Sequence, residues 1–136
     1  MKSTLVHSAL AGGAAAGAAL LYSRLYAFAL DVDFSLVTGT AILIVANMLA
    51  CLMASLAYYR LQQRGARVEV WFNLLFTVIT FASLLGPLMA ELPPQVEAPE
   101  LFLGLAIPLH LFPQLFWLTV KPLVLPMAGV SAHCPA

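Results

Sequence analysis

Four long apolar stretches constrain this chain more than any other feature of its sequence. They cover residues 4–30, 36–59, 70–90 and 101–120. A helix needs about 20 consecutive apolar residues to cross the roughly 30 Å of hydrocarbon in a bilayer, and each stretch meets that length. The connections are short, so each helix should run antiparallel to the one before it. The sequence therefore predicts an all-α fold, a transmembrane antiparallel four-helix bundle, with residues 1–136 forming a single membrane domain.

The composition supports this interpretation and excludes one class of partner. Hydrophobic residues make up 62% of the chain and charged residues only 9%, whereas soluble domains contain about 25% charged residues. The net charge is zero and no run of basic residues occurs, so a nucleic-acid partner has no electrostatic basis. The first apolar run covers about 27 residues, longer than the 7 to 15 of a signal-peptide core, so we expect a retained helix.

The distribution of charge predicts how the chain is threaded. Cytoplasmic loops are enriched in lysine and arginine. With antiparallel helices, five of the basic residues, named at the end of this paragraph, lie on one side of the membrane. The acidic loops around residues 31–33 and 91–100 lie on the other side. We therefore expect an integral protein of the inner (cell) membrane with both termini in the cytoplasm. The basic set comprises Lys2, Arg60, Arg64, Arg67 and Lys121.

The first span contains a row of small residues that predicts close helix packing. Ala9, Gly13 and Gly17 follow each other at intervals of four and include an exact GxxxG. Helices in lipid associate through van der Waals contact, which small residues permit by letting backbones approach. We expect this row to pack against another helix of the same chain, with a helix of a second subunit as the alternative.

A polar pair near the middle of the last span is the principal candidate for a functional site. His110 and Gln114 are four residues apart, and an ionisable side chain at that depth is costly and commonly functional. Trp117 and Lys121 continue the same helical face. Pro108 and Pro113 flank the histidine, so we expect the helix to bend or loosen there.

Other polar residues in the spans could join this pair on one interior surface. We expect Asn47, Cys51, Thr77 and Thr80 at overlapping depths. Two interpretations stay open. The residues could form interhelical hydrogen bonds that fix how the helices dock, or His110, Gln114, Asn47 and Thr77 could bind a quinone, pigment, lipid or small solute.

The same residues argue against several kinds of chemistry. No carboxylate lies within the spans to orient a general base, so we assign no catalytic residue. A membrane haem normally requires two facing histidines, and only His110 lies at mid-membrane depth, which argues against haem. Cys51 lies in a span and Cys134 in the terminal tail, without metal-ligand spacing, so we assign no metal site.

Arg24 is the one basic residue inside a span. It stands between Tyr22 and Tyr26, near the outer end of the first span. One interpretation is that it extends to the outer headgroups while the tyrosines belong to the aromatic belt. The other is that it faces an anionic headgroup, a cofactor carboxylate or an acid on a partner, which makes Arg24 a candidate ligand-binding residue.

The third span ends in Ser83-Leu84-Leu85-Gly86-Pro87, which predicts a kink near Ser83. This ending, followed by an outer loop and a helix with a lone His110, resembles a group of uncharacterised bacterial four-span membrane proteins. The resemblance covers about the last third of the chain. It implies the four-helix architecture and a bacterial source, and it implies no activity. Pro108 and Pro113 depart from the pattern of that group.

Three functions remain as hypotheses. The first is a small accessory subunit of a larger membrane complex, respiratory or photosynthetic. In this role the chain is structural, its partners are other membrane subunits and membrane lipid, and it could contribute a lipid or cofactor contact. The second is a homo-oligomeric ligand-binding or transport unit whose path is lined by the His110/Gln114 face. The third is a membrane enzyme that uses His110 as acid or base. We expect the tail, with His133 and Cys134, to lie along the inner interface.

Overall fold

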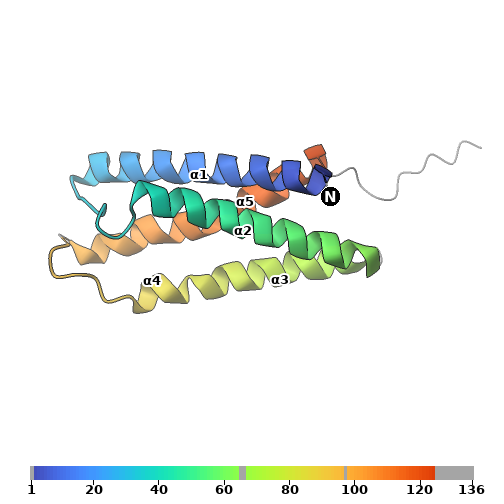
Figure 1. The fold of residues 1–136 in the computed structure, drawn as a ribbon. Helices are drawn as coiled ribbons and strands as arrows, with labels where there is room; N and C mark the ends of the chain where they lie inside the picture. Colours follow the sequence, from blue (N-terminus) through green and yellow to red (C-terminus); the bar gives the residue numbers. More distant parts are fainter. Residues whose placement is uncertain (1, 65–66, 97, 125–136) are drawn as a thin grey trace, which may run out of the picture.

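The computed structural model, which describes residues 2–64, 67–96 and 98–124, is an all-α bundle, as predicted (Figure 1). The tail expected at the inner interface, including His133 and Cys134, lies outside the described residues. The helices in chain order are α1 (Lys2–Leu30), α2 (Thr40–Leu61), η1 (Gln62–Arg64), α3 (Arg67–Ser83), α4 (Leu85–Met89), η2 (Pro99–Leu101) and α5 (Phe102–Val124).

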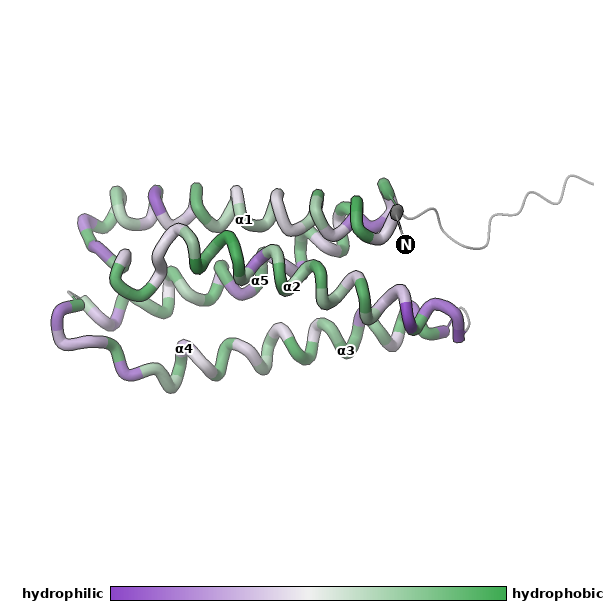
Figure 2. The backbone as a smooth tube through the Cα atoms, viewed as in Figure 1, coloured by the Kyte–Doolittle hydropathy of each residue, from purple (hydrophilic) through white to green (hydrophobic). Residues whose placement is uncertain are grey.

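Four helical segments are long and apolar enough to cross a membrane: Ser3–Leu30, Thr40–Arg64, Arg67–Met89 and Pro99–Val124. Hydrophilic residues gather mainly in the connections at the two ends of the bundle, and apolar residues dominate between them (Figure 2). Large apolar side chains are exposed along the helices, as expected where the surrounding solvent is lipid. The chain is therefore a membrane protein by length and composition.

The bundle has two ends, which we name after a residue at each. The His7 end holds the start of α1, the α2–α3 connection and the end of α5, and the Asp33 end holds the α1–α2 and α4–α5 connections (Figure 1). Helices α1 and α3 run toward the Asp33 end, whereas α2 and α5 run toward the His7 end. Helices α2 and α5 are thus parallel and lie between α1 and α3 (Figure 1).

The helices are buried to very different extents. Within the span windows, 44% of the α1 residues and 39% of the α5 residues are buried in the protein, against 11% for the span formed by α3 and α4. Helix α1 packs along both α2 and α5, whereas α3 contacts α5 and α2 over a smaller surface. The α3 helix is consequently the peripheral member of the bundle.

The packing face of α1 differs from the predicted one. Ala9, Gly13 and Gly17 are exposed, and no atom lies within 4 Å of a Cβ built on either glycine. The prediction that this row packs within the chain is wrong. A neighbouring row of small residues on α1 packs instead. It lies on the same helical face as His7, a polar side chain that must be buried away from lipid. The buried residues of this face, each 0% exposed, are His7, Ala11, Ala15 and Ala19.

The connection after α1 is longer than predicted, because residues 36–39 form a turn rather than the start of α2. Phe34 is buried and its ring lies 5.7 Å from that of Phe102. Its carbonyl accepts the backbone N–H groups of Val37 and Thr38. The buried Phe34 ring fills the Asp33 end of the bundle. Helix α2 therefore begins only at Thr40.

The predicted interruption near Ser83 is confirmed. Helix α3 ends at Ser83, and α4 begins at Leu85. Pro87 has no N–H to donate to the carbonyl of Ser83, four residues earlier. The Leu84 N–H bonds the carbonyl of Phe81, a three-residue spacing that tightens the end of α3.

Helix α5 continues without interruption through Pro108 and Pro113. Pro108 leaves the carbonyl of Gly104 without its helical donor. The hydroxyl of Tyr22 on α1 donates to that carbonyl at 2.8 Å. A side chain from the neighbouring helix therefore replaces the missing backbone hydrogen bond.

Two adjacent glycines of α1 provide a direct test of its packing face. A Cβ on Gly12 would lie 2.9 Å from Met48 Sδ and 3.1 Å from Met48 Cα, whereas Gly13 has open space. We expect Gly12→Ala to be less stable than Gly13→Ala by about 1–2 kcal/mol, because the α2 backbone must move. Unfolding by SDS in mixed micelles measures this difference. Equal stabilities would contradict the assigned face.

Candidate functional site

A closed set of hydrogen bonds joins three helices at the His7 end. Trp117 Nε1 on α5 donates to Ser55 Oγ on α2 at 2.9 Å. His7 on α1 has Nδ1 3.3 Å from Ser55 Oγ and Nε2 3.1 Å from the Trp117 carbonyl oxygen. All three side chains are at most 1% exposed. We call this set the His7 circuit.

The chemistry of these groups fixes where the protons lie. An indole N–H only donates, so the Ser55 hydroxyl proton is free to donate to His7 Nδ1. A carbonyl only accepts, so His7 Nε2 carries the ring proton and donates to Trp117. With this assignment, a neutral imidazole has both nitrogens bonded. A fully satisfied buried network of this kind rigidifies a core and specifies one helix arrangement.

An ion pair next to the circuit attaches α3. Lys121 Nζ on α5 lies 2.7 Å from Glu69 Oε1 in the first turn of α3. The Lys121 ammonium also lies 4.2 Å from the centre of the Tyr58 ring and 5.3 Å from that of Trp117. The carboxylate and two aromatic faces therefore stabilise a lysine that is only 8% exposed.

Further contacts between α3 and α5 continue from this ion pair toward the Asp33 end. Gln114 Nε2 donates to Thr77 Oγ1. His110 Nδ1 lies 3.1 Å from Ser83 Oγ. The face predicted on α5 is thus the face that meets α3. We call these contacts the α3–α5 ladder, which comprises Glu69–Lys121, Phe72–Trp117, Phe76–Trp117, Thr77–Gln114 and Ser83–His110.

His110 is half-buried and has one ring nitrogen engaged. The Ser83 hydroxyl donates its single proton to the Thr80 carbonyl at 2.6 Å, so it accepts from His110 Nδ1. Nε2 is then the acceptor of the neutral ring. Within the described part of the chain, no hydrogen bond reaches that nitrogen.

The remaining predicted residues bond backbone carbonyls rather than His110 or Gln114. Asn47 is buried, but its Nδ2 donates to the Leu43 carbonyl of its own helix, and its Oδ1 has no partner among the described residues. Cys51 Sγ lies 3.6 Å from the Pro113 carbonyl, and Thr80 bonds its own helix. Of the residues expected on one interior surface, only Thr77 and Gln114 are hydrogen-bonded to each other in the described part of the chain, and the shared surface stays a prediction.

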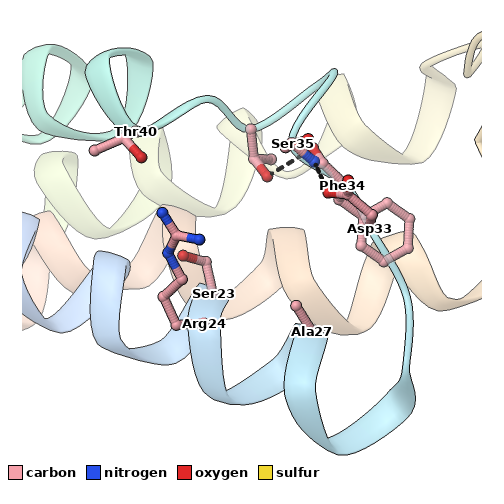
Figure 3. A pocket seen from close by; sticks show the side chains of 8 residues that line it. Ser23, Arg24, Ala27, Asp33, Phe34, Ser35 and Thr40 are labelled. Carbon is pink, nitrogen blue, oxygen red and sulfur yellow. Dashed lines mark hydrogen bonds between the residues drawn. The ribbon is translucent and has the colours of Figure 1, made fainter.

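Arg24 is separate from both groups. It is exposed and lines an open pocket at the Asp33 end, between α1 and the start of α2 (Figure 3). The Asp33 carboxylate lines the same pocket and accepts the Ser35 backbone N–H at 2.7 Å (Figure 3). That hydrogen bond holds the pKa of Asp33 below its usual value.

The polar groups at the His7 end are engaged with one another. Both nitrogens of His7 are saturated, and Lys121 is paired. Among the residues that the structure describes, no three His, Cys, Asp or Glu side chains come together as a metal site would require. The His7 circuit connects α1, α2 and α5, and the adjacent ion pair connects α5 with α3. Side chains at the His7 end thus link all four spans.

Comparisons of this chain with protein families, with curated proteins and with solved structures found no match. The resemblance to uncharacterised bacterial four-span proteins thus stays a prediction. Functional inference depends on the geometry of the bundle itself.

Sequence reasoning missed the His7 circuit, although a signal for it was present. His7, Ala11 and Ala15 share one helical face, as do Cys51 and Ser55 on the second span. A buried histidine needs partners for two nitrogens, and Ser55 lies at the matching depth near the end of its span. Considering the polar residues at the span ends together would have suggested this contact.

The first site prediction concerns Ser55, which both donates and accepts in the circuit. We expect Ser55→Ala to lower the free energy of unfolding by about 2 kcal/mol, because it leaves buried groups of Trp117 and His7 unpaired. Ser8→Ala is the matched control, because the Ser8 hydroxyl bonds only the Leu5 carbonyl of its own helix. Unfolding in SDS mixed micelles compares the two variants. Equal losses would contradict a special role for the circuit.

The second site prediction concerns the α3–α5 ladder. A double-mutant cycle of Gln114→Leu and Thr77→Val should give a coupling energy of about 0.6 kcal/mol, the usual value for a hydrogen bond between membrane helices. The control cycle pairs Gln114→Leu with Thr119→Val, because exposed Thr119 bonds only Leu115 of its own helix. Unfolding free energies of the four proteins in each cycle give the coupling. Zero coupling in the first cycle would remove this contact from the ladder.

Proposed function

We propose that this protein is a small accessory subunit of a larger membrane complex and works by packing its helices against other subunits. The observation that carries the proposal is the free small-residue face of α1, formed by Ala9, Gly13 and Gly17. Both glycines have open space at the Cβ position. The interior of the bundle, by contrast, uses its polar groups to dock its own helices.

The shape of this face suits a helix better than an acyl chain. Leu10 and Leu21 are large and more than half exposed, and they stand on either side of the small residues along α1. The outer surface of α1 is thus notched near its middle. A transmembrane helix crossing there can bring its backbone close to α1, which is the arrangement that small-xxx-small rows favour.

Charge supports one orientation in the membrane. Arg60, Arg64 and Arg67 lie around the α2–α3 connection at the His7 end, while Asp31 and Asp33 lie at the opposite end. The positive-inside rule makes the His7 end cytoplasmic. The proposal includes an inner-membrane location in a bacterium and a respiratory or photosynthetic assembly as the parent complex, with lipid around the exposed faces.

The test is co-purification from native membranes in mild detergent. We expect subunits of another protein to purify with the tagged chain, and Gly13→Leu to reduce their yield about tenfold, equivalent to about 1.4 kcal/mol, by filling the notch. Ala57→Leu is the control, because Ala57 is exposed on α2, away from this face. Recovery of the chain alone, or only as a homo-oligomer, would contradict the proposal.

A second function is favoured by one observation, the free Nε2 of half-buried His110. In this alternative the chain is a homo-oligomeric ligand-binding or transport unit, and His110 and Gln114 contact the ligand. His110→Ala distinguishes the two functions in the same purification. Unchanged partner subunits support the accessory role, whereas loss of a bound small molecule from an intact homo-oligomer supports the alternative.

A further inference from the structure

The pocket at the Asp33 end carries opposite charges on its two sides. Arg24 comes from α1, and Asp33 from the connection that follows it (Figure 3). Four hydroxyl-bearing residues also line the pocket: Ser23, Ser35, Thr38 and Thr40.

The guanidinium of Arg24 is available to an anion. It extends from α1 toward Thr40, at the start of α2 (Figure 3). Among the described residues, no carboxylate oxygen lies within 4 Å of its nitrogens. Arg24 stands six residues before the end of α1, which is about 9 Å along the helix axis. Its long side chain can therefore reach the level where lipid phosphates lie.

The carboxylate of Asp33 is available to a cation. One oxygen accepts the Ser35 N–H, and a carboxylate can accept several hydrogen bonds. Asp33 is exposed, and an exposed aspartate is charged at neutral pH. Within the described chain, Asp33 and Arg24 form no ion pair with each other, so each charge can face a ligand.

Exposed apolar side chains occur within two residues of the pocket-lining residues along the chain. Phe28 is 88% exposed, Leu36 70% and Ile42 60%. They belong to the end of α1, the connection and the first turn of α2. A ligand with a charged head in the pocket could thus lay apolar chains along these residues.

We propose that this pocket binds the headgroup of phosphatidylethanolamine. The phosphate accepts hydrogen bonds from Arg24 and from the Thr40 hydroxyl, because the Ser23 and Thr38 hydroxyls already donate to backbone carbonyls. The primary ammonium donates hydrogen bonds to Asp33. Phosphatidylglycerol carries the phosphate without a cation, and the choline headgroup has no N–H to donate. This inference goes beyond the proposed subunit function, because it assigns a specific lipid to a site away from the α1 notch.

Native mass spectrometry of the full chain in detergent tests the proposal. Phosphatidylethanolamine, phosphatidylcholine and phosphatidylglycerol with identical acyl chains are added as an equimolar mixture. We expect about a tenfold preference for phosphatidylethanolamine. Because the three lipids compete in one sample, their ratio does not depend on how much of a variant folds. Soluble glycerophosphoethanolamine, added alone, should bind much more weakly than the lipid.

Two variants separate the contributions of the charges. Asp33→Asn keeps the acceptor for the Ser35 N–H but loses the negative charge, so the preference over phosphatidylglycerol should disappear. Arg24→Gln should reduce binding of all three lipids about tenfold. Arg60→Gln is the control, because Arg60 is exposed in the last turn of α2 at the other end. Equal binding of the three lipids, no effect of Arg24→Gln, or equally tight binding of glycerophosphoethanolamine would overturn the proposal.

Discussion

Buried polar groups must find partners inside the protein because lipid offers none, and the arrangement of this bundle depends on that requirement. His7 is the clearest case. An imidazole with no exposed surface needs two partners, and α2 and α5 supply them through Ser55 and the Trp117 carbonyl. The same contacts bring three helices together at one depth. Apolar packing alone would be less selective, because lipid tails contact apolar side chains as favourably as neighbouring helices do.

The attachment of α3 follows from the same constraint but is weaker. Few residues of this span are buried, and its contacts with α5 are mainly an ion pair, aromatic contacts and two side-chain hydrogen bonds. Hydrogen bonds between membrane helices contribute about 0.6 kcal/mol each. The α3 helix should thus separate from the bundle at lower free energy than α1, which packs along two helices. Exposed α3 surface is also a place where a larger assembly could supply further contacts.

The sequence was sufficient to predict the four spans, the interruption near Ser83 and the α5 face that includes Gln114. These features depend on length, on a proline and on helical spacing, all of which are local. It was not sufficient to choose between the two small-residue rows of α1, because alanine and glycine permit close packing in either. His7 decides the choice, since it continues the Ala11 row and cannot face lipid without cost. The partners of Asn47 and His110 depend on tertiary placement, which spacing within one helix does not specify.

The contact between Tyr22 and Gly104 bears on how α1 and α5 find their alignment. Pro108 makes a backbone acceptor available at one level of α5, whereas a carbonyl in an unbroken turn already has a donor. A slide of α1 by one turn would carry the tyrosine hydroxyl away from this acceptor and leave both groups unpaired in hydrocarbon. Pro108 would weaken an isolated helix. Here it fixes the position of α1 along the axis of α5, because only one alignment pairs the free carbonyl with the tyrosine hydroxyl.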